Sequence, residues 1–256
     1  MAIFGPDFRS GLVRPLYQPA NPVGLVGAIA IFVGLVMFNQ VLQVAFGIGL
    51  HPAAAFNPAD QQLLLRSVMI GLLPAGLLTA LLAWGLAFVR GGRPATALAL
   101  RLPALGIGGW LAITLGFLIA LYLVVALAVY FLSIDTSSKG AVETAMAALV
   151  SDRAYGVIVA GIAIGAPLAE ELTFRGQIFA ALSKTRLGFI GTSFITSLLW
   201  ALIHITEPVY AIALIFVMGL VLSGLLIRFG SLWVTFICHA IWNGIYSVAL
   251  LALPQT

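Results

Sequence analysis

The stretch AEELTFRG, residues 169–176, places two adjacent glutamates and an arginine inside an apolar run that extends from Ala154 to about Leu182. A charged side chain in the hydrocarbon core of a membrane costs on the order of 2.5–3.5 kcal/mol. On a helix, Glu171 and Arg175 are spaced i, i+4 and can neutralise each other as a structural ion pair, whereas Glu170 points about 100° away from Glu171. Two interpretations stay open: Glu170 is a spare glutamate that faces water, or it is a carboxylate that does chemistry in a cavity.

Two of the three histidines also lie in apolar runs, both in the C-terminal half of the chain. His204 follows Trp200 by one helical turn in WALIHITEP, and His239 shares a helix face with Asn243 in HAIWN. A lone histidine of this kind is more often a packing residue than a catalyst. Two histidines, an asparagine and Glu170, placed on three helices of one half of the chain, instead predict a shared polar site.

The connection between these helices gives a first test of that prediction. A short turn near residues 184–187 would make the fourth and fifth apolar runs an antiparallel pair, with Glu170 and His204 at similar depth because both lie 17 residues from Leu187. Pro167 is a candidate break in the helix, since proline disrupts a helix interior. Glu170 would then lie in the first turn of a second half-helix, where the helix dipole favours negative charge.

The three motifs together resemble those of the CPBP family, which comprises type II CAAX prenyl endopeptidases and their bacterial, Abi-like relatives in bacteriocin processing or immunity. The resemblance rests on EE-x-x-x-R at residues 170–175 before Gly176, on an aromatic residue four positions before His204, and on H-x-x-x-N at residues 239–243. It covers roughly residues 161–244, and Trp200 stands where the family usually has phenylalanine. The resemblance implies an all-helical intramembrane endopeptidase whose peptide or protein substrate is associated with the membrane, and this substrate need not be prenylated.

Two versions of the chemistry remain open. In the first, Glu170 acts as a general base on water with help from His204, while His239 and Asn243 donate hydrogen bonds to the developing oxyanion. In the second, Glu170, His204 and His239 are ligands of a catalytic zinc ion, a candidate cofactor that accepts such a set. The H-E-x-x-H motif is absent and Asn243 is a poor zinc ligand, so the metal-free version is favoured.

Composition sets the fold class independently of these motifs. The 256 residues are 62% hydrophobic and 8% charged, whereas soluble domains are about 25% charged. Long apolar runs without alternation predict helices, so we expect an all-α, polytopic membrane helix bundle. In a membrane protein we interpret the net charge of +4 as a signal for the orientation of the spans and not for nucleic-acid binding. The single cysteine, Cys238, excludes an intramolecular disulfide.

About seven transmembrane helices are predicted from the length that a bilayer requires. Residues 1–23 form a proline-containing N-terminal tail, and the apolar run after them is too long for a signal peptide. Residues 24–153 form an N-terminal transmembrane region that includes a short interfacial helix within residues 139–150, and residues 154–253 form the CPBP-like catalytic core. The predicted spans are Gly24–Phe46, Ser67–Val89, Gly106–Leu132, Ala154–Leu182, Gly188–His204, Tyr210–Arg228 and Leu232–Leu253.

The distribution of basic residues predicts the orientation of these spans in the cell membrane. One side receives eight basic residues, namely Arg9, Arg14, Arg90, Arg93, Arg101, Lys184, Arg186 and Arg228, and the other receives three, namely Arg66, Lys139 and Arg153. Cytoplasmic loops carry the excess of lysine and arginine. We therefore expect a cytoplasmic N-terminus.

The alternative is a membrane protein without enzymatic activity, either an immunity-type interaction factor or a transporter. A transporter predicts ionisable residues spread over both halves of the bundle, and the first three spans have none that is securely buried. The first span carries Asn39, Gln40 and Gln43, for which hydrogen bonding between helices is favoured over a polar path. An inactive relative is expected to have lost a motif residue, and none is lost here.

Overall fold

The computed structural model describes residues 3–20, 23–90, 92–133 and 138–249, and this part of the chain contains helices but no strand. Six of its helical stretches are long and apolar enough to cross a membrane, which confirms an all-α bundle of about seven spans when the shorter apolar helix α10 (Gly188–Leu202) is added. The six are α2 (Leu25–Leu50), α3 (Gln61–Val89), α5 (Ile107–Leu132), the run of α7 to α9 (Tyr155–Leu182), α11 (Val209–Phe229) and α12 (Leu232–Ala249).

The first two long helices extend further than their sequences predict. Helix α2 ends at Leu50, because the apolar residues after Phe46 continue its pattern. Helix α3 begins at Gln61, since Arg66 does not mark a helix boundary and instead pairs with Asp152 at 2.5 Å between Nε and Oδ2. Helix α6 (Ala141–Leu149) forms inside the stretch predicted to be a short helix, and its apolar side packs on α7 (Tyr155–Ala160).

The prediction that Pro167 breaks the fourth span is wrong. The chain stays helical from Tyr155 to Leu182, through α8 (Ala166–Glu170) and α9 (Phe179–Leu182), with π-helical segments at Gly161–Gly165 and Glu171–Ile178. In the first π segment the N–H of Ala166 donates to the carbonyl of Gly161, five residues back. Glu170 therefore does not lie in the first turn of a separate half-helix, and the dipole argument does not apply to it.

Glycines bring this interrupted helix close to α3. A Cβ atom on Gly76 of α3 would overlap the carbonyl of Gly165, and a Cβ on Gly165 would lie 2.7 Å from the carbonyl oxygen of Leu72. Any side chain at these two positions would push the helices apart. The close approach fixes the π segment that precedes Glu170, and π segments within α-helices occur frequently at functional sites.

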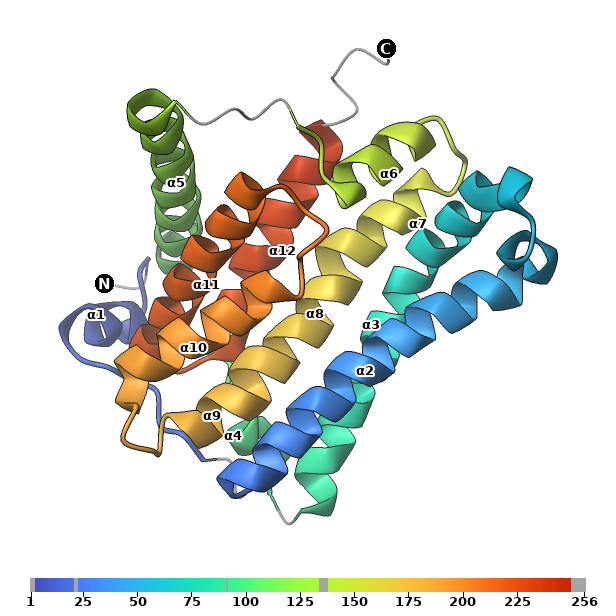
Figure 1. Ribbon diagram of the computed structural model, residues 1–256. Helices are drawn as coiled ribbons and strands as arrows, with labels where there is room; N and C mark the ends of the chain where they lie inside the picture. Colours follow the sequence, from blue (N-terminus) through green and yellow to red (C-terminus); the bar gives the residue numbers. More distant parts are fainter. Residues whose placement is uncertain (1–2, 21–22, 91, 134–137, 250–256) are drawn as a thin grey trace.

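The bundle has two chemically different ends. Figure 1 shows α1 (Pro6–Val13), α4 (Pro94–Ala97) and the turn between α9 and α10 at one end, and α6 at the other. The eight basic residues assigned above to the cytoplasmic side lie in or beside the elements of the first end. We refer to this end as the basic end and to the other as the α6 end.

Candidate active site

A cavity of about 500 Å³ brings the four predicted catalytic residues together. Its walls come from α2, α6, α8, the end of α10 with the loop after it, α11 and α12. Glu170, His204, His239 and Asn243 all line it, which the sequence could only suggest from their positions along the chain. At the α6 end the lining includes Glu143, Thr206 and Glu207, and because Thr206 is exposed we refer to this end of the cavity as its mouth.

The two adjacent glutamates have different environments. The side chain of Glu170 is 18% exposed, whereas that of Glu171 is 0% exposed. The Nε1–H of Trp200 donates a hydrogen bond of 2.7 Å to Oε2 of Glu170. This contact orients the carboxylate and leaves Oε1 without a hydrogen bond in the described part of the chain. Glu170 is thus the glutamate of the pair that reaches the cavity.

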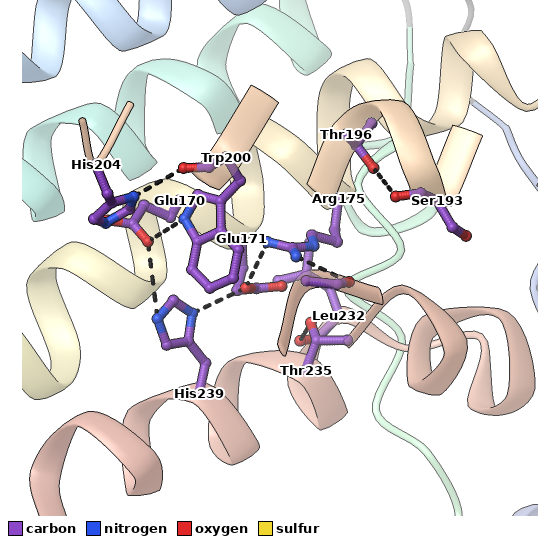
Figure 2. A network of polar contacts seen from close by, with 11 residues as sticks. Glu170, Glu171, Arg175, Ser193, Thr196, Trp200, His204, Leu232, Thr235 and His239 are labelled. Atoms are coloured by element: carbon purple, nitrogen blue, oxygen red, sulfur yellow. Dashed lines mark hydrogen bonds and ion pairs between the residues drawn. The ribbon is translucent and has the colours of Figure 1, made fainter. Parts of the chain in front are cut away.

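Glu171 and Arg175 lie fully buried behind this carboxylate. Nη1 of Arg175 lies 3.2 Å from Oε1 of Glu171, and Nη2 donates to the carbonyl of Gly219 at 3.3 Å. The guanidinium carbon also lies 4.6 Å from the centre of the Trp200 ring, a cation–π distance. Figure 2 shows Glu170, Glu171, Arg175 and His239 gathered around Trp200. The charge of Arg175 is therefore held by a carboxylate, a carbonyl and an aromatic face.

His239 connects the two glutamates. Its Nδ1 lies 3.0 Å from Oε1 of Glu171, and its Nε2 lies 3.8 Å from Oε2 of Glu170. Because an ionised carboxylate can only accept, Nδ1 carries the proton of the shorter contact. Glu171 thereby fixes the orientation of the ring and aims Nε2 toward Glu170. The sequence predicted a partner for Glu171 in Arg175 and missed this second one.

His204 lies just beyond the end of α10 and is also oriented by a neighbour. Its Nδ1 lies 2.8 Å from the carbonyl oxygen of Trp200, one turn earlier. A carbonyl only accepts, so Nδ1 is the donor and the neutral ring keeps an acceptor lone pair on Nε2. No hydrogen bond joins His204 to Glu170 in the described residues, although both line the cavity. A molecule in the cavity could bridge them.

Asn243 contributes an amide from the same helix as His239. Its Nδ2 donates to the carbonyl of Ile162 at 3.0 Å, within the first π segment. An amide nitrogen has two N–H groups, so one of them is left for the cavity. The sequence identified Trp200 only as the aromatic residue of a motif and missed its role. Its indole donates to Glu170 and contacts both histidines, with ring centroids 5.8 Å from His204 and 5.1 Å from His239.

The candidate zinc ligands do not form a metal site. Within the described residues no three side chains of histidine, cysteine, aspartate or glutamate are arranged to hold a metal ion. In both histidines Nδ1 is bonded to an acceptor, Glu171 for His239 and a backbone carbonyl for His204, so Nε2 is the nitrogen of each ring that is left for the cavity. Within the described residues Glu170, His204 and His239 are not positioned as a three-ligand set.

The three amide side chains of α2, those of Asn39, Gln40 and Gln43, differ in their hydrogen bonding. Oδ1 of Asn39 accepts a hydrogen bond of 3.1 Å from Thr79 of α3, as expected for bonding between helices. Gln40 and Gln43 line the cavity and have no hydrogen bond within the described residues. The expectation of bonding between helices is wrong for these two glutamines, because their side chains face the cavity instead of a neighbouring helix.

Comparison with known proteins gives one family match. Residues 153–245 match the family described as type II CAAX prenyl endopeptidase Rce1-like. No curated protein and no solved structure matches the chain. The matched segment contains all three motifs and confirms the resemblance to the CPBP family that they indicate.

Proposed function

We propose that this multi-pass membrane protein is an intramembrane endopeptidase, because residues 153–245 match the family described as type II CAAX prenyl endopeptidase Rce1-like. It hydrolyses a peptide bond of a substrate that reaches the cavity within the membrane. The observation that carries the proposal is the contrast between two neighbouring carboxylates: Glu170 reaches the cavity at 18% exposure, while Glu171 at 0% is neutralised behind it.

In the proposed mechanism, Glu170 accepts a proton from a water molecule that then attacks the substrate carbonyl. General-base catalysis of this kind contributes about 10²- to 10⁴-fold to the rate. The hydrogen bond from Trp200 holds one oxygen of Glu170 and leaves the other for the water. Nε2 of His204 is an acceptor and can share the same water from a second direction.

Hydrogen-bond donors are needed to stabilise the negative charge that develops on the substrate carbonyl oxygen. His239 directs Nε2 into the cavity beside Glu170, where an Nε2–H would donate to this oxygen, and Asn243 presents its second amide N–H from one turn further along α12. Each donor of this type is worth about 3–4 kcal/mol of transition-state stabilisation. Glu171 and Arg175 act as positioning residues, since Glu171 holds the ring of His239 and Arg175 neutralises Glu171.

The orientation in the membrane follows from the basic end. We propose that this end and the N-terminus face the cytoplasm, as the excess of arginine and lysine favours. The mouth of the cavity, at Glu143, Thr206 and Glu207, then faces the opposite side of the membrane. Residues 1–23 are a cytoplasmic tail, 24–153 an accessory region and 154–253 the catalytic core in this scheme. Substrate peptides would enter from the extracytoplasmic side.

The test is cleavage of a random peptide library by the protein purified in detergent, with new termini identified by mass spectrometry. We expect wild-type protein to cleave, and Glu170→Gln to lose at least a hundredfold in rate at normal yield, because an amide keeps the shape but is not a base. Asp60→Asn is the matched control, since it makes the same chemical change outside the cavity. Equal rates for Glu170→Gln and the control would refute the proposed role.

A further inference from the structure

The search for a further site leads to helix α2, outside the segment that matches the family. This helix has a mean hydropathy of 2.2 over its apolar window, and its side chains with hydrogen-bonding groups are Asn39, Gln40 and Gln43. Gln43 is spaced i+4 from Asn39 and i+3 from Gln40, so it neighbours both on the helix surface, and all three line the cavity. An amide of a membrane-spanning helix that has no partner in the protein is costly unless it meets water or a ligand.

Gln40 and Gln43 are the two that have no hydrogen bond within the described residues, whereas Asn39 is bonded to Thr79. We refer to Gln40 and Gln43 as the amide pair. A glutamine side chain has both a carbonyl acceptor and an NH₂ donor. It therefore matches the N–H and C=O groups of a peptide backbone, whatever the side chains of that peptide are.

The level of the amide pair along the cavity follows from helix packing. Helix α2 runs antiparallel to the run of α7 to α9: Ala28 packs with Ile178 and Ala181, and the rings of Phe32 and Phe174 lie 5.0 Å apart. Continuing this register by four residues on each helix places Val36 at the level of Glu170. The amide pair then lies four and seven residues further along α2, about 6 and 10 Å toward the mouth at 1.5 Å per residue.

These distances match an extended peptide. At about 3.3 Å per residue, the amide pair lies two to three residues from a bond that reacts at Glu170. Resting on the proposed endopeptidase function, we propose that Gln40 and Gln43 bind the main chain of the substrate, two to three residues from the scissile bond on the side of the mouth. They are positioning residues, which hold the peptide extended so that its reacting carbonyl meets Glu170. The peptide segment on this side is recognised through its backbone.

The test uses a fluorescence-quenched peptide that the wild-type protein cleaves, together with copies of it N-methylated at single backbone positions. Gln40→Leu and Gln43→Leu should each lower kcat/KM roughly two- to tenfold through KM, because each removes neutral hydrogen bonds. Met37→Leu is the control, on an exposed part of α2 that does not line the cavity. N-methylation two or three residues from the scissile bond should impair cleavage by wild-type protein and have a smaller effect in the glutamine variants.

Such a double-mutant cycle isolates the contact between enzyme and backbone. Glutamine variants that match Met37→Leu, or N-methyl effects of equal size in all proteins, would overturn the proposal. The N-methyl series on wild-type protein needs no substitution and guards against a variant that folds poorly. If instead Glu170→Gln cleaved normally while the glutamine effects persisted, the catalytic assignment would fail and the amide pair would stand.

Discussion

Removing Arg175 should destabilise the protein more than any other single change of an arginine. The side chain is 0% exposed and is held by Oε1 of Glu171 at 3.2 Å, the carbonyl of Gly219 at 3.3 Å and the face of Trp200 at 4.6 Å. In Arg175→Met the carboxylate of Glu171 stays buried, and the Nδ1–H of His239 is left as its hydrogen-bond donor. Breaking a buried pair in this way costs about 3–5 kcal/mol, because one charge is left uncompensated.

The magnitude can be measured by thermal unfolding in detergent, followed by tryptophan fluorescence. For a chain of this size about 1 kcal/mol shifts Tm by roughly 2–4 °C, so Arg175→Met should lower Tm by roughly 6–20 °C. The double variant Glu171→Gln/Arg175→Met removes both charges and should recover most of that loss. Arg186→Met changes an exposed arginine and should stay within about 0.5 kcal/mol of wild type. A stable Arg175→Met, or a double variant as unstable as the sum of the single ones, would refute the reasoning.

Three further predictions concern pH, topology and the indole of the site. The hydrogen bond from Arg66, aided by the N–H of Ala154, holds the pKa of Asp152 below its usual 3.8. The stabilisation from the pair of Asp152 and Arg66 is therefore fully present above pH 3.8 and is lost as the pH falls through the lowered pKa of Asp152. In Asp152→Asn the decrease of Tm below pH 4 should be smaller than in wild type. A reporter fused after Thr256 should be extracytoplasmic and one fused near Lys184 cytoplasmic; the reverse pattern at both sites would contradict the proposed orientation. Trp200→Phe keeps a ring but removes the donor to the proposed base, so kcat should fall by roughly tenfold or more with normal yield, and an unchanged kcat would contradict this role.

The sequence predicted the features that depend on the length of a segment or on the spacing of residues along the chain. The lengths of the apolar runs predicted the spans, because a bilayer fixes the length of a helix that crosses it. The i, i+4 spacing predicted that Glu171 and Arg175 lie side by side, and they do, at 3.2 Å. The motifs in the C-terminal half predicted a shared polar site, and their four residues line one cavity.

The contacts that shape the site could not be predicted in this way. Glu171 lies in a π-helical segment, and a π segment rotates the residues after it relative to an α-helix, so the face that each residue occupies cannot be read from 3.6-residue spacing. No residue type in that segment signals a π-helix. The contacts of His239 with Glu171 and of Trp200 with Glu170 join different helices, and they depend on how those helices pack.

The central claim is that the carboxylate of Glu170 activates water without a metal ion, and one measurement tests it most directly. Wild-type protein is dialysed exhaustively against a chelator, and cleavage activity and metal content are then determined on the same sample. The account predicts full activity with no detectable zinc. Activity that is lost on chelation and restored by zinc alone would contradict it, because metal affinity would then depend on side chains that we assign to proton transfer and oxyanion binding.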